Sequence, residues 1–270
     1  MPLPTVYPIP QFCDCNEPIS IRLIYISNSF TRIGLLLNFS KILKSLLMKE
    51  NLSRYTSLAS AIDTLTRNQI TLLDPAAWED RTDSITMLEY KRKGEFKSVL
   101  AACFTSSNDT FHHWSVFAKP GGVCIRFHKT HLCERISLLS DGTDDNNSIS
   151  IHPIQYHNAD DPRINKYIRY DDLPFIKQDA YAAECEWRIL FRSQTEDVRQ
   201  IPVPIEPFMV SEIILDPWLP DALVDPLRDL LRKIDGYSGL NIRKSIIVKN
   251  DAFINRAKGA ASKKDIAQNI

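Results

Sequence analysis

The chain has 270 residues, and its 33 Lys and Arg residues balance its 33 Asp and Glu residues. A formal net charge of zero excludes a general nucleic-acid or anionic-membrane binder held by bulk charge. An apolar content of 44% with 24% charged residues excludes a wholly disordered or fibrous chain, and the 8 glycines form no GxGxxG or GxxxxGK(S/T) phosphate loop.

The N-terminal segment, residues 1–47, is rich in Ile, Leu, Ser and Asn and differs from the rest of the chain. Its apolar spacing predicts a helix over about residues 30–49. Two interpretations of the segment stay open. In one, Met48 is the natural start and the upstream residues are spurious translation; in the other, the segment is an extension that packs on the domain.

Hydropathy and cysteine content indicate the cellular setting. No run approaches the ~20 apolar residues that span a bilayer, and no basic region precedes an apolar stretch as in a secretory signal. The six cysteines include no CxxC pair, and Cys103, Cys124 and Cys185 lie in apolar runs that favour buried thiols. We therefore expect a cytoplasmic protein with no membrane partner and no bound metal.

Between residues 57 and 105 the pattern predicts four elements. Apolar residues at helical spacing indicate an amphipathic helix over 57–69, and a strand over 70–73 follows and ends at Asp74. Residues 82–98 have the pattern of a solvated helix, and the apolar run over 99–105 favours a buried strand.

The middle of the chain alternates between apolar and polar residues. This period of two predicts strands over 123–128, 149–156 and 184–191. Polar stretches over 141–147 and 157–174 predict long connections between them.

The C-terminal part begins with a predicted strand over 210–215. A helix follows, with Asp225 as its N-cap and Pro226 at its first position. A last strand is expected over 242–248, and the basic, polar tail over 253–270 is expected to fray.

This order of elements predicts the fold class. Helices dominate the first half of the chain and strands the second, and the two do not alternate as βαβ units. We therefore expect an α+β fold: a single domain over residues 48–252, with a mainly antiparallel sheet and flanking helices.

Three groups of residues, in order between residues 53 and 248, share a pattern with a known family. They are Arg54-Tyr55-Thr56-Ser57 with Leu72 to Asp80; Cys103-Phe104-Thr105 with Trp114 to Ala118 and Gly121 to Phe127; and Lys177 and Tyr181 with Glu184-Cys185-Glu186-Trp187-Arg188. Together they resemble a widespread prokaryotic family labelled domain of unknown function 2971. Trp78-Glu79-Asp80 departs from the family's usual Phe-Asn-Asp-Pro, and Phe117 stands where Tyr is usual. The family's label supplies no reaction.

Glu184-x-Glu186 is the sharpest chemical feature, and it opens the strand predicted over 184–191. Period two places both carboxylates on one face, about 6–7 Å apart along the chain. Two carboxylates at that distance can separate their pKa values, so that one stabilises a cation while the other acts as a base.

This motif is similar to that of arginine-specific ADP-ribosyltransferases, which place an Arg on an early strand, a Ser-Thr-Ser-like segment on a middle strand and Glu-x-Glu on a later one. The resemblance implies an NAD-consuming transferase, in a toxin or defence setting by analogy. Glu186 would stabilise the oxocarbenium-like transition state, and Glu184 would orient or deprotonate an acceptor, either protein or nucleic acid. The NAD-binding residues that it implies are Arg54 for the pyrophosphate, Thr105 or Ser106 beside the nicotinamide ribose, and Tyr55, Trp114 or Phe117 stacking on nicotinamide.

Other interpretations stay open. The sequence also holds an acidic group that consists of Glu79, Asp80 and Asp83. In a structural interpretation, Glu184, Glu186 and Arg188 form a solvated charge ladder, and Arg54 pairs with the acidic group. In a non-catalytic sensor or interaction domain, the charged strand face binds a partner. In a metal-dependent nuclease, the acidic group and the two glutamates together hold Mg²⁺.

Overall fold

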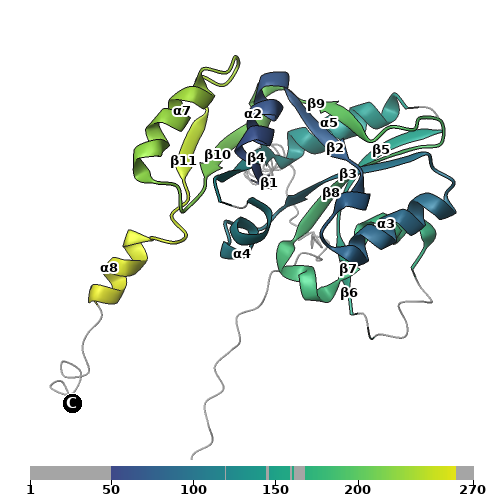
Figure 1. Ribbon diagram of the computed structural model, residues 1–270, viewed down its shortest axis with the longest axis horizontal. Helices are drawn as coiled ribbons and strands as arrows, with labels where there is room; N and C mark the ends of the chain where they lie inside the picture. The colour runs from purple at the N-terminus through teal and green to yellow at the C-terminus, as the bar shows by residue number, and fades with distance from the viewer. Residues whose placement is uncertain (1–49, 119, 144–145, 159, 161–167, 260–270) are drawn as a thin grey trace, which may run out of the picture. The chain divides into compact units, whose positions relative to one another are not determined.

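The computed structural model describes residues 50–118, 120–143, 146–158, 160 and 168–259 (Figure 1). The helix predicted over residues 30–49 and the end of the tail, residues 260–270, lie outside the described residues. The described chain forms two compact units. Unit 1 consists of residues 50–53, 69–107 and 127–205, and unit 2 of residues 54–68, 108–126 and 206–259.

Unit 1 is built on an antiparallel sheet with the strand order β5-β8-β3-β2-β9. The strands are β5 (Asn147–Pro153), β8 (Glu186–Ser193), β3 (Ser98–Thr105), β2 (Gln69–Leu73) and β9 (Gln200–Pro204). β3 and β8 pair along their whole length, from Ser98 opposite Ser193 to Thr105 opposite Glu186. Most residues of both strands are buried whichever way they point, so the sheet has little solvated face here.

α3 (Arg81–Lys93) packs beside β3 in unit 1 (Figure 1). It begins at Asp80, whose carboxylate accepts hydrogen bonds from the backbone N–H groups of Thr82 and Asp83. Its buried face joins a core cluster of Met87, Tyr90, Val99, Ala101 and Leu190. The helix predicted over 82–98 is therefore shorter than expected, and one of its faces is buried rather than solvated.

The connections of unit 1 contain more structure than expected. α5 (Lys129–Asp141) buries Leu132 and Ile136 and, like β9, has no counterpart among the predicted elements. The strand predicted over 149–156 is divided into β5 and β6 (Gln155–His157). β6 pairs in parallel with β7 (Ile176–Gln178) in a separate small sheet. Two short 3-10 helices, η3 (Tyr170–Phe175) and η4 (Asp179–Glu184), flank β7.

Unit 2 contains the strands β10 (Val210–Leu215) and β11 (Asn241–Lys244), which pair in parallel. Next to β10 lies β4 (Gly122–His128), and next to β4 lies β1 (Asn51–Ser57); each of these two strands has residues in both units. The helices of unit 2 are α2 (Leu58–Arg67), α4 (Phe111–His113), which continues into the π-helix η2 (Trp114–Ala118), α7 (Val224–Arg232) and α8 (Asp251–Gly259). A core cluster of Trp114, Ala118, Cys124 and Ile214 holds unit 2 together.

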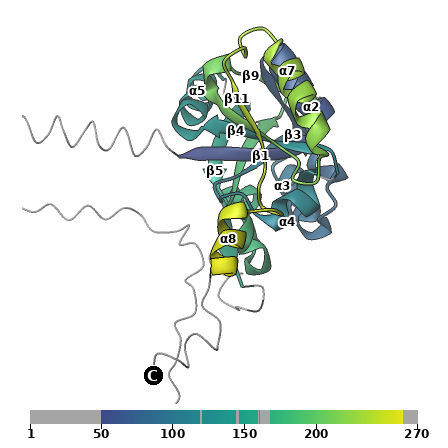
Figure 2. The same ribbon diagram turned by 90° about the vertical axis from the view of Figure 1, so that its left-hand side faces the viewer.

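Two C-terminal predictions are wrong. The N-cap of α7 is Leu223, not Asp225, because the 3-10 turn η6 (Asp221–Leu223) leads directly into the helix. β11 ends at Lys244, and residues 251–259, expected mostly to fray, form α8, drawn in yellow in Figure 2. The predicted helix over 57–69 is confirmed as α2, with Ser57 as its N-cap.

The predicted fold class is confirmed: the protein is α+β, with a mainly antiparallel sheet and flanking helices. None of the helices within the described ranges is long and apolar enough to cross a membrane.

Candidate functional site

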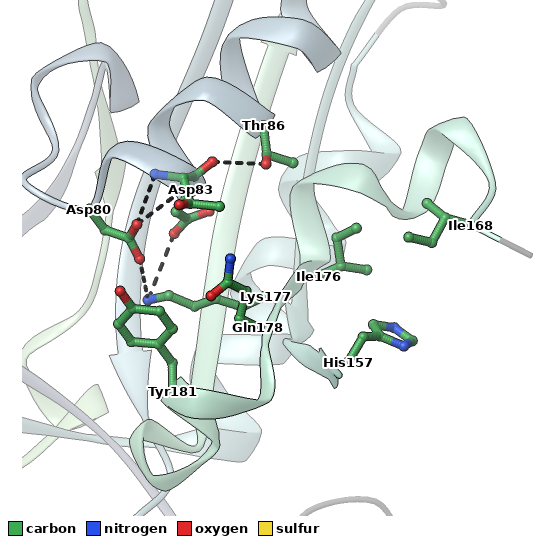
Figure 3. Close-up of a pocket in the computed structure, with 10 residues that line it drawn as sticks. Asp80, Asp83, Thr86, His157, Ile168, Ile176, Lys177, Gln178 and Tyr181 are labelled. Atoms are coloured by element: carbon green, nitrogen blue, oxygen red, sulfur yellow. Dashed lines mark hydrogen bonds and ion pairs between the residues drawn. The ribbon is translucent and has the colours of Figure 1, made fainter. Parts of the chain in front are cut away.

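A cluster of charged side chains lies inside unit 1, contributed by α3, β7, η4 and β8. Its members are Asp80, Asp83, Lys177, Glu184, Glu186 and Arg188. The side chains are 0–20% exposed, with Arg188 fully buried and Asp80 the most open. Figure 3 shows Asp80, Asp83 and Lys177 together at a cavity. Residues more than 90 positions apart in sequence therefore meet at one place.

Arg188 is the buried cation of this cluster. Its guanidinium makes a two-pronged ion pair with Asp83, at 2.7 Å from Nη2 to Oδ2 and 3.1 Å from Nη1 to Oδ1. Nε and Nη2 also donate to Glu186 Oε1, at 3.0 and 2.8 Å, and Nη1 donates to the carbonyl of Pro174 at 2.8 Å. The predicted solvated charge ladder is therefore wrong for Glu186 and Arg188, since both are buried and paired.

Lys177 is the second cation, and four carboxylates surround it. Its Nζ lies 2.8 Å from Glu184 Oε2 and 3.3 Å from Glu186 Oε2. It also lies 3.7 Å from Asp80 Oδ2 and 3.8 Å from Asp83 Oδ2. Of the carboxylates that the nuclease hypothesis brings together, Asp80, Asp83 and the two glutamates thus approach one point, but an ammonium group occupies it. Within the described part of the chain, no three His, Cys, Asp or Glu side chains are arranged to hold a metal ion.

The Glu184-x-Glu186 motif reaches this geometry by a different route from the predicted one. β8 begins at Glu186, whereas Glu184 ends η4. Cys185, between them, has the left-handed backbone conformation with φ 45°. Strand alternation therefore does not align the two carboxylates; a tight turn at Cys185 brings both of them to Lys177.

Hydrogen bonds from two other segments hold the backbone of this motif. Thr105 Oγ1 donates to the carbonyl of Glu184 at 2.6 Å. The backbone N–H of Ser106 donates to the carbonyl of Cys185 at 3.0 Å. On the other side, the N–H of Glu186 donates to the hydroxyl of Tyr156 at 2.8 Å. Thr105 and Ser106 thus act on the glutamate pair through its backbone.

The environment moves the pKa values of the two carboxylates on Arg188 in opposite directions. Burial raises the pKa of Asp83 above its ordinary value, despite the opposing charge of Arg188. Burial acts in the same direction on Glu186, but the charges of Arg188 and Lys177 together lower its pKa below its ordinary value. When the pKa values of two neighbouring carboxyl groups differ in this way, one group can act as an acid while the other is an anion.

The two cations stay protonated at neutral pH. Burial opposes the charge of Lys177, but Glu186 and Glu184 raise its pKa above the ordinary 10.5. Glu186 and Asp83 likewise hold the pKa of Arg188 above its ordinary value. Lys177 therefore supplies a positive charge to this site.

The remaining residues of the predicted NAD site lie in unit 2. Tyr55 packs edge-to-face on Trp114 with ring centroids 5.0 Å apart, and both donate to Asp109. Trp114 is only 1% exposed and belongs to the core of unit 2, whereas Phe117 is 43% exposed. Arg54 is half-buried in the same unit. The predicted site residues thus form two groups, one in each unit.

Sequence reasoning missed two features of this site. The sequence shows Lys177 as part of a family pattern, but it does not show that Lys177 lies between carboxylates. Asp80 is 97 positions earlier in the chain, and no local pattern indicates that the two side chains meet. Cys103, expected to be a buried thiol, is exposed and is hydrogen-bonded to Glu186. The exposure of Cys103 could have been inferred from its position near the end of β3, close to the polar residues Thr105 and Ser106.

Comparisons with known proteins add nothing to this geometry: no family model, no curated protein and no solved structure matches the chain.

Proposed function

We propose that the protein cleaves the nicotinamide–ribose bond of NAD and transfers ADP-ribose, with Glu186 as the residue that stabilises the cationic transition state. The observation that supports this proposal is the Glu184–Glu186 pair, whose backbone is held by hydrogen bonds and in which the pKa of Glu186 is lowered. A carboxylate that stays ionised in a buried site interacts strongly with positive charge that develops nearby.

The proposed reaction has two steps. The bond between ribose C1′ and the nicotinamide nitrogen breaks, and nicotinamide leaves neutral with the electron pair. The oxocarbenium ion that forms on the ribose is the cation that Glu186 stabilises. A nucleophile of the acceptor then bonds to C1′ and loses its proton, for which Glu184 is the proposed base.

Two residues of unit 1 support the glutamate pair. Thr105 and Ser106 orient it, as their hydrogen bonds to its backbone indicate.

Nicotinamide release from NAD tests the proposal. The wild type should release nicotinamide, and Glu186→Gln should slow the release roughly 10²–10³-fold, the usual cost of losing one group that stabilises transition-state charge. Glu196→Gln, the same change at an exposed site, is the matched control. Because Glu186→Gln leaves Arg188 partly unpaired, circular dichroism must show that the variant is folded. A folded wild type that binds NAD without releasing nicotinamide would contradict the proposal.

A metal-dependent nuclease is the second candidate, and one observation favours it: Asp80, Asp83 and both glutamates lie within 4 Å of one point, the Lys177 Nζ. Metal binding there requires the ammonium to move away. Nucleic-acid cleavage that needs Mg²⁺ and stops with EDTA would favour this candidate, whereas nicotinamide release that EDTA does not affect favours the transferase.

A further inference from the structure

Both carboxylate oxygens of Glu186 are occupied in this structure. Oε1 accepts two hydrogen bonds from Arg188, at 3.0 and 2.8 Å, and Oε2 accepts one from the Lys177 ammonium at 3.3 Å. The same ammonium donates to Glu184 Oε2 at 2.8 Å, and the side chains of the two glutamates are at most 8% exposed. One of the two cations must therefore move away before Glu186 can face a positive charge on a substrate.

Arg188 is held too firmly to be that cation. It is fully buried, and its planar fork donates twice to Asp83 and twice to Glu186. A further hydrogen bond goes to the carbonyl of Pro174. Withdrawal of Arg188 would leave Asp83 buried without its closest cation, which is costly. Arg188 is therefore a fixed part of the site.

Lys177 has a second pair of carboxylates within reach. Its Nζ lies 3.7 Å from Asp80 Oδ2 and 3.8 Å from Asp83 Oδ2, which is ion-pair distance but too long for a hydrogen bond. Asp80 Oδ2 is buried and, among the described residues, accepts no hydrogen bond. A displacement on the order of 1 Å toward Asp80 gives the ammonium a charge-assisted hydrogen bond there. The lysine can thus exchange one pair of carboxylates for the other.

The surroundings of Lys177 leave space for this movement. Lys177 lines a cavity of about 130 Å³, whereas neither glutamate does (Figure 3). The ring of Tyr181 also lines the cavity and lies 4.6 Å from the ammonium, in a cation–π contact. Pockets that bind drug-sized ligands measure roughly 300–1,000 Å³, so the cavity is too small for a dinucleotide in this state. The position of Lys177 is therefore that of a closed site.

The ammonium of Lys177 also has the charge that a substrate would bring. The nicotinamide ring of NAD is positively charged, and this charge passes to the ribose as the bond between them breaks. An ammonium at Glu186 repels such a cation and competes with it for the same oxygen. The apparent affinity for NAD is then reduced by the fraction of the protein in which Lys177 has left.

We propose that Lys177 is an autoinhibitory contact: its ammonium occupies Glu186 Oε2 in the free protein, and the positive charge of NAD displaces it toward Asp80 Oδ2. The inference rests on the proposed function and concerns the regulation of the same site. It assigns two positions to one side chain, at the glutamates without substrate and at the aspartates with substrate.

Steady-state kinetics of nicotinamide release tests this inference. Lys177→Gln should lower the KM for NAD about tenfold or more with little change in kcat, because no cation then has to leave. A lysine that serves only the fold would instead lower kcat/KM when it is replaced. Lys129→Gln is the matched control, since Lys129 also pairs with a carboxylate, Glu50, and lies over an aromatic ring, Trp187, but outside the charged cluster. Its KM should equal that of the wild type.

A cationic probe tests the displacement without turnover. 1-Methylnicotinamide has the positively charged ring of NAD, and nicotinamide is its neutral counterpart. In isothermal titration calorimetry, Lys177→Gln should bind 1-methylnicotinamide about tenfold more tightly than the wild type, and nicotinamide equally. Asp80→Asn keeps the helix cap but removes the charge at the second position, and should bind the cation about tenfold more weakly. Asp74→Asn is its matched control, since Asp74 also caps a short helix, through Ala76 N–H, outside the cluster.

These measurements separate the inference from the proposed function. Nicotinamide release by the wild type with an unchanged KM in folded Lys177→Gln would overturn the inference and leave the function. Tighter binding of the cation by Lys177→Gln, with no release by either protein, would support displacement of the ammonium and contradict the transferase. If circular dichroism shows Lys177→Gln to be unfolded, Asp80→Asn decides. Binding of 1-methylnicotinamide equal to that of the wild type, or no saturable binding by the wild type, would overturn the inference.

Discussion

At the scale of single residues, Arg188 and Lys177 allow four carboxylates to be buried in one place. A charge taken out of water without a partner costs several kcal/mol, so each cation is needed to keep the acidic residues in the interior. The two cations are not equivalent. Arg188 binds with a planar fork that matches Asp83, whereas Lys177 is a compact charge that several carboxylates approach.

Replacement of Arg188 tests the first of these roles. Arg188→Met removes the cation nearest to Asp83 and one of the two cations at Glu186 from the interior, and should lower the free energy of unfolding by about 3–5 kcal/mol. Urea denaturation followed by fluorescence measures the change. Arg92→Met is the control, because Arg92 also pairs with a carboxylate, Glu89, but on the exposed surface of α3, and its urea midpoint should not change. Equal midpoints for the two variants would show that the buried pair contributes little.

The pH dependence of stability tests the state of Glu186. Its pKa in the folded protein is lower than its ordinary value of 4.5. Its contribution to stability is therefore complete above about pH 4.5 and is lost as the pH falls through the lowered folded-state pKa. The free energy of unfolding should fall in this acidic range for the wild type, and less steeply for Glu186→Gln. Glu196→Gln should follow the wild type, and a slope that Glu186→Gln leaves unchanged would contradict the assignment.

At the scale of elements, the junction between η4 and β8 controls the geometry of the glutamate pair. Cys185 adopts a left-handed conformation there, which costs an L-residue roughly 1–2 kcal/mol and costs glycine little. The hydrogen bonds from Thr105 and Ser106 to this turn hold it in place. The two glutamates meet at Lys177 because the strand begins at Glu186, two residues later than its alternation suggests, and leaves Cys185 to make the turn.

A glycine–alanine comparison tests this backbone strain. Cys185→Gly should be more stable than Cys185→Ala by about 1 kcal/mol, since only glycine avoids the Cβ penalty. At Ala59, an exposed residue of α2, the order should reverse, because glycine weakens a helix by roughly 0.5–1 kcal/mol relative to alanine. Thermal unfolding of the wild type and these three variants gives both differences. Alanine more stable than glycine at both positions would show that the turn is not strained.

At the scale of the whole molecule, the chain passes between the two units repeatedly, so neither unit is a continuous segment. Each has a core cluster of its own: Met87, Tyr90 and their neighbours in unit 1, and Trp114 with Ile214 in unit 2. Residues distant in sequence make up both clusters. The packing within each unit, rather than the order of elements along the chain, defines them.

A substitution that creates a cavity in the core of unit 2 tests the division of the chain into two units. Ile214→Ala should lower the free energy of unfolding by about 2–5 kcal/mol, because Ile214 is fully buried. Amide hydrogen exchange should increase first in β10 and η2, whose residues pack in its cluster. Leu230→Ala, at a 51% exposed position of the same unit, should leave both measurements almost unchanged. Exchange that increases equally in β3 and β8 would contradict the division.

Local patterns were sufficient for elements whose residues pack in the way their spacing suggests. The apolar spacing over residues 57–69 predicted α2, and the apolar run over residues 99–105 predicted β3. Prediction was poorer where neighbours override the pattern. α5 has weak amphipathic spacing, and Asp225 has the chemistry of an N-cap but lies inside a helix that an earlier turn starts. Of the candidate site, the sequence pointed to Glu184 and Glu186 and, in one interpretation, to Arg188 beside them, but not to Lys177 between the carboxylates or to the Asp83 pair with Arg188.

The sequence by itself determined the fold class and most of the strands, because spacing along a chain governs which side chains share a face. Only the tertiary structure decided that the turn at Cys185 brings Glu184 and Glu186 to one point, that Lys177 and Arg188 pair with the clustered carboxylates, and that these charged residues are buried. Charge interactions act through space between residues far apart in sequence, and their strength depends on burial. A linear pattern contains neither quantity.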